Sequence, residues 1–434
     1  MTVRSGKMHS DGISVDELLG RDDISGWGAP GPERPIHSLL IPTRNRPDLI
    51  HVPVGFYLRS SRDDVEVVVA DGSDDPEPVR ERLRAWLCDR RLVLLDHSPG
   101  RLGKVQSMRE NWSRGLLECR GRWITVIGDD DVCDPALAYF LETIERRLPE
   151  AQAVAWQAIK FRHGLPEPEV PAQIPLGYDT MVINSRGHLE RQMTWPVDNK
   201  LPEFGASLYH GALRRELLAH IRTERNGSFF RFAAIDWDMA WTATHFTPAF
   251  IAAKRPYSIM GHSEKSNSAS VRRLDARRRA FEQWLSEDAR FDGISLELFE
   301  SKGVDKMFAM FLPVMILGFR NAFAHAYGYA HIPLNKQNFL QTCILYCLCQ
   351  DDEESFEWCC EQLVIFARAF MGVEIPKERL VRPGAPEHMF YGYNDEKLFF
   401  DRSLVDYDLQ KFSNLVFRLI PHWTFSFRPL GSGE

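Results

Sequence analysis

Short apolar runs alternate with longer amphipathic stretches over the first third of the chain. Five of these runs are nearly continuous in apolar residues and end at turn-forming residues, which is typical of buried strands. They are Ile36 to Ile41, Val65 to Ala70, Leu92 to Leu95, Trp123 to Ile127 and Ala153 to Trp156. Between the runs, apolar residues recur at helical spacing, as in Leu137, Leu141 and Leu148. The alternation predicts an α/β fold, a mainly parallel sheet with helices on both faces, whose ligands bind beyond the carboxyl ends of the strands.

The hydrophobic pattern changes after the fifth run. Residues 164–177 are rich in proline and irregular, and a mixed pattern continues to about Ser270 before a mainly helical pattern begins. A chain of 434 residues also exceeds what a single hydrophobic core usually supports. We therefore expect a partly flexible leader over 1–35, an α/β domain over 36–269 and a helical carboxyl-terminal domain over 270–434.

Composition limits the classes of function. Hydrophobic residues make up 44% of the chain and charged residues 26%, as in soluble globular proteins. The net charge of −7 argues against a nucleic-acid partner, because such proteins neutralise phosphates with lysine and arginine. The first residues contain no apolar segment of a secretory signal, so we expect a cytoplasmic protein.

Two features leave room for contact with a membrane. The most apolar stretch, Met307 to Phe319, is shorter than the roughly 20 residues that a membrane span needs, and it contains Pro313. We interpret it as a buried helix, the alternative being peripheral contact with the inner face of a membrane. A group of five arginines is expected to form a solvated helix face, with contact to an anion or an acidic lipid as the alternative. The group is Arg272, Arg273, Arg277, Arg278 and Arg279.

The eight cysteines lack the regular spacing of a disulfide framework, so we expect reduced thiols. Those from Cys343 to Cys360 lie on helix-like sequence without paired metal-binding knuckles. Buried helical cysteines are therefore expected rather than a metal site.

Polar loops follow the first two strand-like runs. The first loop reads PTRNRP from Pro42 to Pro47, and the second reads DGSDDP from Asp71 to Pro76. An acidic residue at a strand end can accept hydrogen bonds from a base or ribose, and Thr43 can meet another polar edge of a nucleotide. Either loop alone is also ordinary turn chemistry.

The loop after the fourth run contains three consecutive carboxylates, Asp129, Asp130 and Asp131. Like charges at this spacing are unfavourable unless a cation compensates them, and hard oxygen ligands suit Mg²⁺ or Mn²⁺. The alternative is a turn and helix cap before Pro135. A metal beside nucleotide-sized loops suggests cleavage of a phosphate ester or anhydride, by a glycosyltransferase or by a polymerase-like nucleotidyltransferase. The position of the acidic turn in a strand-helix series of an acidic chain favours the glycosyltransferase.

The order of these segments carries a resemblance to a known family. The segments IPTRNRPDLI, VEVVVADGSDD and GKVQSMRENWSRGLLECRGRWITVIGDDDVCDPAL resemble the family 2 glycosyltransferases of the GT-A fold over about Ile36 to Leu148. The resemblance implies a GT-A domain over 36–269, in which both loops, the segment 103–111 and the acidic turn bind a nucleotide-sugar donor. The donor-binding residues that it implies are Pro42, Thr43, Arg44, Asp71, Ser73, Gly103, Lys104, Arg109, Asn111, Asp129 and Asp130.

The resemblance also implies a divalent metal, Mn²⁺ or Mg²⁺, held by an Asp-x-Asp motif. We expect Asp131 to contact the metal, with Asp129 as its partner in one of two possible registers. His262 resembles a residue that closes over the donor diphosphate or completes the metal shell, the alternative being a surface histidine. Lys265 is a weaker candidate for the same role.

A further segment, AAIDWDMAW, resembles the acidic pair that provides the family's catalytic base. This implies Asp236 as the base, with Asp238 as the second candidate and helix capping as the alternative role. Inverting transfer needs a base because a carboxylate must take the proton of the attacking hydroxyl. Trp195 and Trp237 either stack on sugar faces or pack in the core.

Together these features predict a metal-dependent inverting glycosyltransferase. It would move a sugar from a nucleotide-sugar donor to a hydroxyl of a saccharide, lipid-linked or other acceptor, in polysaccharide or glycoconjugate synthesis. The alternatives are a non-catalytic nucleotide- or sugar-binding assembly module on the same scaffold and a metal-dependent nucleotidyltransferase. The sequence specifies neither the sugar, the base, the acceptor nor the oligomeric state.

Overall fold

The computed structural model describes residues 34–162, 171–177, 179–263, 266, 272–287, 291–382, 390–420 and 426–428. Most of the predicted leader, the boundary predicted near residue 269 and Lys265 lie outside these residues.

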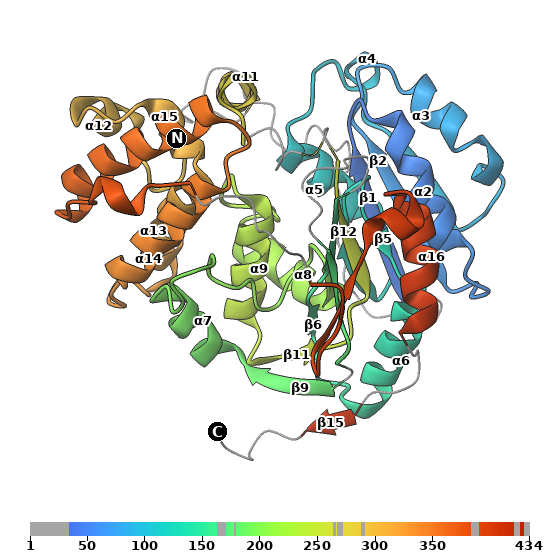
Figure 1. Ribbon diagram of the computed structural model, residues 1–434. Coiled ribbons are helices and arrows are strands. Elements are labelled where there is room, and N and C mark those ends of the chain that lie inside the picture. Colours follow the sequence, from blue (N-terminus) through green and yellow to red (C-terminus); the bar gives the residue numbers. More distant parts are fainter. Residues whose placement is uncertain are drawn as a thin grey trace, which may run out of the picture.

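A nine-stranded mixed sheet forms the centre of the molecule (Figure 1). Its strand order is β15-β9-β11-β6-β10-β4-β1-β2-β3. The strands are β1 (His37–Thr43), β2 (Val65–Asp71), β3 (Leu92–Asp96), β4 (Trp123–Val126), β6 (Ala153–Trp156), β9 (Asp179–Asn184), β10 (Gly211–Arg214), β11 (Ala249–Ala253) and β15 (Ser426–Arg428). All five predicted strand runs are therefore strands of this sheet.

Most neighbouring strands of the sheet pair parallel, as the predicted mainly parallel sheet requires. The strands β3, β2, β1 and β4 are mutually parallel, as expected. The strand β10 is inserted between β4 and β6 and pairs antiparallel with both. It has only four residues and follows a tight turn in which His210 has a φ of 51°. Such a short run inside a mixed pattern gives little sequence signal, and the prediction missed it.

The alternation of side chains along β1 and β2 explains why both strands are continuous in apolar residues. Leu39 and Val67 point to one face of the sheet, into a core shared with α2 and α6. Leu40 and Val68 point to the other face, into a core shared with α5, α8 and α9. Because helices cover both faces, these strands are buried on both sides, and the polar His37, Ser38 and Glu66 within them hydrogen-bond to buried partners.

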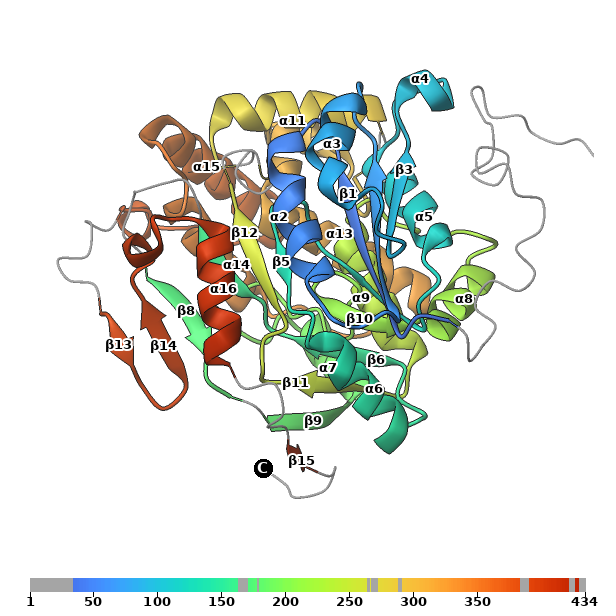
Figure 2. The same cartoon turned by 90° about the vertical axis from the view of Figure 1, so that its right-hand side faces the viewer.

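Helices cover the sheet on both faces and form a separate layer beside it (Figures 1 and 2). Those preceding residue 250 are α2 (Pro47–Leu58), α3 (Glu77–Arg82), α4 (Pro99–Leu102), α5 (Met108–Glu118), α6 (Leu137–Arg147), α7 (Ser185–Met193), α8 (Arg215–Glu224) and α9 (Ile235–Phe246). The later ones are α11 (Leu274–Glu287), α12 (Leu296–Ser301), α13 (Leu312–Tyr327), α14 (Lys336–Leu348), α15 (Glu353–Phe366) and α16 (Leu409–Leu419).

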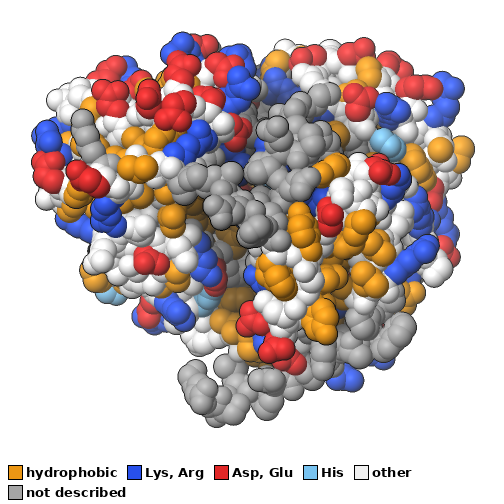
Figure 3. All heavy atoms as spheres, in the orientation of Figure 1, with side chains coloured by type: hydrophobic (Ala, Val, Ile, Leu, Met, Phe, Trp, Pro, Cys, Tyr) orange, Lys and Arg blue, Asp and Glu red, His pale blue; other side chains and the backbone are white. Residues whose placement is uncertain are grey.

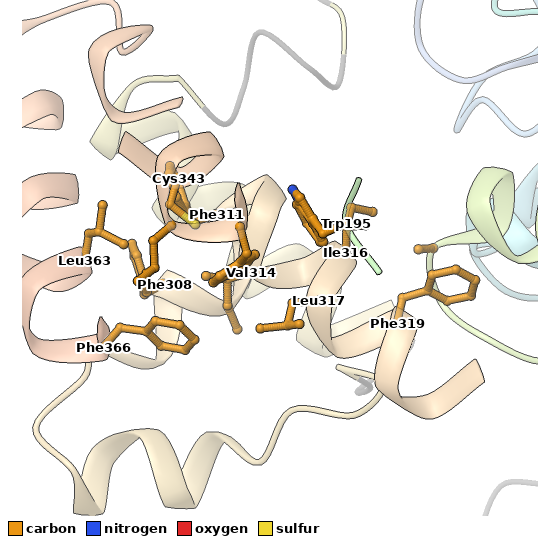
Figure 4. Packing of buried hydrophobic residues seen from close by; sticks show 14 of the residues in the cluster. Trp195, Phe308, Phe311, Val314, Ile316, Leu317, Phe319, Cys343, Leu363 and Phe366 are labelled. Atoms are coloured by element: carbon orange, nitrogen blue, oxygen red, sulfur yellow. The ribbon is translucent and has the colours of Figure 1, made fainter. Parts of the chain in front are cut away.

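The apolar stretch from Met307 to Phe319 is a buried helical segment, as interpreted from the sequence. It forms a short turn of 3-10 helix and the first half of α13, and it lies in the core shared by α12, α14 and α15 (Figure 4). The same core includes Trp241 of α9 and Met193 of α7, so the helical region packs directly on the sheet domain. No helix among the described residues is long and apolar enough to cross a membrane.

The end of the chain returns to the sheet domain, so the mainly helical region expected over 270–434 also contributes strands. The strand β14 (Lys397–Phe400) lies between β13 (Gly392–Tyr393) and β8 (Ala172–Pro175), and β15 joins the central sheet beside β9 (Figure 2). The helix α16 packs on the same side, where Phe412 stacks on Phe161 with 4.2 Å between ring centroids. The amphipathic pattern of α16 predicts a helix with a buried face, but it does not indicate which surface buries that face.

The cysteines and the arginine group agree only in part with expectation. All eight cysteines are free thiols, and those from Cys343 to Cys360 are buried except for Cys349. Within the arginine group, Arg277 is buried, which corrects its assignment to a solvated face. Its guanidinium donates to the sulfur of Cys359 and to the side chain of Gln350. An arginine side chain is buried when such partners satisfy its donors, and the sequence did not reveal them.

Phe319 joins the helical region to the sheet domain, because its ring packs against Trp241 at 5.2 Å and Phe232 at 5.5 Å between centroids. We expect Phe319→Ala to lower the free energy of unfolding by about 3–5 kcal/mol, the usual cost of removing a buried phenylalanine ring. Tyr393, which is 79% exposed, provides the control, since Tyr393→Ala should change stability by no more than about 0.5 kcal/mol. Urea unfolding followed by tryptophan fluorescence measures both. Equal stability of the two variants would show that α13 does not hold the two regions together.

Candidate active site

The two loops predicted to bind a nucleotide are hydrogen-bonded to each other at the carboxyl ends of β1 and β2. The Gly72 amide donates to the carbonyl of Thr43 at 2.9 Å, and the Asn45 amide donates to the hydroxyl of Ser73 at 2.8 Å. Asn45 has a φ of 57°, a left-handed conformation that asparagine tolerates better than most residues. The loops therefore form one continuous polar surface. Pro42 lies directly behind it, paired with Ala70 inside the sheet.

Asp71 ends β2 with one satisfied and one unsatisfied carboxylate oxygen. Its side chain is buried, and Oδ1 accepts a hydrogen bond from the Ser73 amide at 2.9 Å. The other oxygen, Oδ2, is buried and has no hydrogen-bond partner among the described residues. Burial raises the pKa of Asp71, and the hydrogen bonds from Ser73 oppose that shift. A buried acceptor without a partner costs free energy, so this oxygen is suited to accept from a ligand.

Asn111 joins the end of β2 to the helix α5. Its amide nitrogen donates to the carbonyl of Ala70 at 3.0 Å, and its amide oxygen lies 2.7 Å from Nδ1 of His97. His97 follows β3 and was not predicted as a site residue. Burial lowers the pKa of His97, so its imidazole is neutral at pH 7. This contact gives Asn111 a role in positioning the strand end.

The remaining residues predicted around 103–111 lie between the end of α4 and the first turn of α5. Gly103 ends α4 with a φ of 75°, and Lys104 pairs with Glu110 at 2.7 Å between Nζ and Oε1. Glu110 also accepts from the Ser107 amide and completes a capping box at the helix start. Arg109 is partly buried on the same turn.

The three carboxylates of the acidic turn do not point at a common centre. In the described part of the chain, no group of three or more histidine, cysteine, aspartate or glutamate side chains is arranged to hold a metal ion by itself. Each aspartate has its own set of partners, so the three carboxylates differ chemically.

Asp129 connects the acidic turn to the first loop. Its Oδ2 accepts from the Thr43 hydroxyl at 2.6 Å and lies 3.1 Å from Nε of Arg46, which the sequence did not indicate as a site residue. Its Oδ1 is buried without a hydrogen-bond partner among the described residues. Burial raises the pKa of Asp129 to about 7, although Arg46 and Thr43 oppose the shift.

Both carboxylate oxygens of Asp131 accept hydrogen bonds from the protein. Its Oδ2 accepts from the Gly128 amide at 2.6 Å and from the Tyr209 hydroxyl at 3.0 Å, and its Oδ1 accepts from the Gly261 amide at 2.9 Å. Nε2 of His210 lies 3.1 Å from Oδ2. Burial disfavours ionisation, but His210 and the two amides outweigh it and hold the pKa of Asp131 below its usual value. A metal ion at Asp131 would therefore compete with protein donors that already contact both of its oxygens.

Asp130 is the carboxylate of the turn that keeps some exposure, 7% of its accessible surface. Its Oδ2 accepts from the hydroxyls of Ser263 at 3.1 Å and Ser266 at 2.5 Å. The strand β12 (Ser258–His262) crosses so close to the turn that a Cβ on Gly261 would lie 1.7 Å from the carbonyl oxygen of Asp130. Only glycine fits at this crossing.

The predicted site histidine, His262, directly follows Gly261 on β12 and is partly buried. Burial and nearby cations lower its pKa, and the charges of Asp131 and Asp130 oppose that shift. The neutral form of the imidazole is therefore favoured at pH 7.

A chain of hydrogen bonds orients His210 beside the acidic turn. The Trp156 indole donates to the hydroxyl of Ser258 at 2.8 Å, and this hydroxyl lies 2.8 Å from Nδ1 of His210. When Ser258 donates to Nδ1, the proton of the imidazole is on Nε2, facing Asp131. Sequence reasoning missed Tyr209 and His210, since a single tyrosine and histidine in an irregular stretch carry no periodic or motif signal.

The two aspartates at the start of α9 have different surroundings. Asp238 is fully buried, pairs with Arg225 at 2.7 Å and accepts from the amides of Arg231 and Phe232. These contacts hold the chain that enters the helix, so Asp238 has a structural role. Asp236 is partly exposed, and its Oδ1 accepts from the adjacent Trp237 amide at 2.9 Å.

Asp236 and the acidic turn both act electrostatically on Tyr209. Burial raises the pKa of Asp236. The pKa of Tyr209, which donates to Asp131, is raised by its burial, by Asp131 and Asp130, and also by the charge of Asp236. The same tyrosine therefore lies within electrostatic reach of both acidic groups.

Trp195 and Trp237 pack in the core rather than on a surface that a sugar could reach. Trp195 is fully buried, and its indole donates to Thr342 of α14 at 3.0 Å. Trp237 is 5% exposed and packs against Phe204 with 4.6 Å between ring centroids. Of the two roles considered from the sequence, core packing is the one observed.

A cleft of about 690 Å³ lies between these loops and α11. Arg44, Lys104, Val105, Ser107 and Glu110 line it on the sheet side. Arg279, Glu282, Gln283, Ser286 and Glu287 line it on α11. Figure 3 shows acidic and basic side chains along the upper surface of both regions, which are separated by a gap. Polar groups on both walls suit a charged or hydroxyl-rich ligand.

Residues 38–174 match the family model described as glycosyl transferase family 2. The chain therefore carries a family 2 glycosyltransferase region. This match confirms the family and the enzyme class expected from the sequence. The sheet with helices on both faces and the helical region beside it agree with the expected GT-A fold.

Solved structures resemble the chain at low sequence identity. TarS 1–349 from S. aureus is 12% identical over 78% of this chain and 92% of its own, with a TM-score of 0.35. The mannosyltransferase PcManGT from Pyrobaculum calidifontis, in complex with GDP-Man and Mn²⁺, is 18% identical over 83% and 93%, with a TM-score of 0.36. Glucosyl-3-phosphoglycerate synthase from Mycobacterium tuberculosis is 19% identical over 48% and 63%, with a TM-score of 0.27. A search of curated proteins gave no match.

The contacts of the acidic turn predict that Asp131 contributes much more to stability than the neighbouring Asp130 does. In metal-free buffer, we expect Asp131→Asn to lower the free energy of unfolding by about 3–5 kcal/mol, because it removes the charge that Gly128, Gly261 and His210 compensate. The side chain of Asp130 faces two serine hydroxyls. We therefore expect Asp130→Asn to lower the free energy of unfolding by only about 1 kcal/mol. Denaturant unfolding in EDTA measures both. A stable Asp131→Asn variant would leave this carboxylate available as a metal ligand.

Proposed function

We propose that this glycosyltransferase is a metal-dependent, inverting enzyme that moves a sugar from a nucleotide-sugar donor to a hydroxyl acceptor. The observation that carries the proposal is the buried, unpartnered Oδ2 of Asp71 in the joined loops after β1 and β2. A donor base or ribose offers the hydrogen-bond donor that this oxygen lacks. Thr43 and Ser73 lie in the same loops, so the nucleoside would be held at the carboxyl edge of the sheet, with Arg44 of the cleft beside its diphosphate.

The residues of the acidic turn fit a divalent metal that the chain holds together with its substrate. Mg²⁺ and Mn²⁺ at such sites keep one or two carboxylates together with substrate phosphates, so three protein ligands are not required. Asp130 would hold the ion, because it keeps some exposure, whereas both oxygens of Asp131 already accept from the protein and the unpartnered oxygen of Asp129 is fully buried. His262 is the second candidate ligand. The ion would offset the negative charge of the leaving nucleoside diphosphate.

Asp236 would act as the base. Its raised pKa reflects a desolvated carboxylate, which accepts a proton more readily than an exposed one. The ion pair of Asp238 with Arg225 supports this choice between the two aspartates, since a buried charge held by a guanidinium is a poor proton acceptor. In a single displacement, the acceptor oxygen forms its bond to the anomeric carbon as the bond to the diphosphate breaks, and Asp236 takes the hydroxyl proton.

Metal removal tests the proposed function directly. With a panel of nucleotide sugars and Mn²⁺, we expect release of the nucleoside diphosphate by transfer or slow hydrolysis, and no release after treatment with EDTA. Turnover should return when Mn²⁺ or Mg²⁺ is added in excess over the chelator. Asp130→Asn should behave like the chelated enzyme at every metal concentration. Unchanged turnover in EDTA would exclude metal dependence, and a lack of turnover with every donor and simple acceptor, together with metal-independent nucleotide binding, would favour a binding module.

Asp236→Asn tests the assignment of the base. We expect loss of transfer by a factor of about 10² to 10⁴, the usual contribution of a general base, with nucleotide affinity unchanged. Asp395→Asn, at an exposed position remote from α9 in sequence, provides the control and should retain full activity. Single-turnover assays with parallel binding titrations measure both quantities. Wild-type turnover by Asp236→Asn would exclude this residue as the base.

A further inference from the structure

The helix α11 presents a polar face to the cleft. Successive cleft-lining residues are one or three positions apart, so these residues share one side of the helix. They are Arg279, Glu282, Gln283, Ser286 and Glu287. A helix packed on a protein core would place apolar residues on its inward side. This helix also lies outside residues 38–174, the part of the chain that matches the family model. It therefore adds a polar wall that the family match does not account for.

Contacts on other sides of α11 hold this wall in place. The guanidinium of Arg277 donates to the Cys359 sulfur at 3.0 Å and to the Gln350 side chain at 2.7 Å. It also lies 5.0 Å from the ring centroid of Trp358. The Phe281 ring stacks on Phe291 with 5.5 Å between centroids. Because buried groups fix the helix against the helical region, its polar face has a defined position opposite the nucleotide loops.

An ion pair joins α11 to the loop after β1. Nη1 of Arg44 lies 2.7 Å from Oε1 of Glu287, and the two side chains are 30% and 21% exposed. Gln283 donates to the same oxygen of Glu287 at 2.9 Å. Arg44 directly follows Thr43, which holds Asp129 of the acidic turn. Arg44 of the proposed donor site is therefore paired with Glu287, a carboxylate from the helix on the other wall of the cleft.

We propose that Glu287 sets the affinity of the enzyme for its nucleotide donor by competing for Arg44. In the free enzyme, Glu287 holds Arg44 across the cleft. When the donor binds, its diphosphate takes the guanidinium from Glu287, since phosphate oxygens accept from arginine in the same forked geometry as a carboxylate. The exchange consumes part of the binding free energy. This competition rests on the proposed function, because it requires a nucleotide in the cleft.

The size of the effect follows from the exposure of the pair. Ion pairs at partly exposed positions are worth about 0.2–1 kcal/mol, which corresponds to a factor of about 1.5 to 5 in a dissociation constant. Removing the competing carboxylate should therefore tighten donor binding by this factor. The gain depends on Arg44 and should disappear when Arg44 cannot bind the diphosphate.

A double-mutant cycle tests the competition. Dissociation constants are measured by calorimetry, at about 0.15 M salt with Mn²⁺, for the nucleoside diphosphate among UDP, GDP, ADP and CDP that binds the wild type best. We expect Glu287→Gln to bind it about 1.5 to 5 times more tightly, and Arg44→Gln to bind it more weakly. In the Arg44→Gln background, Glu287→Gln should have no further effect.

A matched control separates the ion pair from a general change in charge. Glu374 pairs with Arg368 at the same 2.7 Å in the helical region, and neither residue lines the cleft. Glu374→Gln removes the same charge and should leave the affinity unchanged. Equal gains from Glu287→Gln and Glu374→Gln, or a gain that persists without Arg44, would overturn the competition while the proposed function stands. If the wild type binds no nucleoside diphosphate, the proposed function fails, and the competition fails with it.

Discussion

The buried carboxylate of Asp131 is the interaction on which the rest of the site depends. An ionised side chain that is withdrawn from water costs several kcal/mol unless charges and hydrogen-bond donors replace the lost hydration. Its replacements come from the acidic turn itself, from β12 and from the turn before β10, through Gly128, Gly261, Tyr209 and His210. The carboxylate is stable only when these segments meet. Folding of the acidic turn is therefore coupled to the strands on both sides of it.

This coupling determines where the remaining acidic groups point. With Asp131 turned into the protein, Asp130 faces the serines after β12 and Asp129 faces the first loop. The contact between Asp129 and Thr43 then ties the acidic turn to the same loop that contacts Ser73 through Asn45. The run of three carboxylates is tolerated because each has its own hydrogen-bond donors and because burial raises the pKa of Asp129 to about 7, which favours its neutral form.

The sequence could predict the elements whose signal is local. The five strand runs, the helices between them and the loops at the strand ends follow from periodicity and from the rule that ligands bind beyond parallel strands. It could not predict the features that depend on tertiary contacts. The insertion of β10, the return of α16 to the sheet domain and the burial of Arg277 each require a partner distant in the sequence. The same holds for Asp131, which accepts from Tyr209 and Gly261 and whose charge His210 also stabilises.

The buried carboxylates of this protein fall into two kinds that the sequence alone does not distinguish. Asp131 and Asp238 have donors for both oxygens, and these pairs hold segments together. Asp71 and Asp129 each keep one buried oxygen without a partner among the described residues. An unsatisfied buried acceptor costs about 1–3 kcal/mol. A ligand that supplies the missing donor recovers this free energy on binding. The same physical rule therefore separates Asp131, whose contacts hold segments together, from Asp71 and Asp129, whose hydrogen bonding is incomplete.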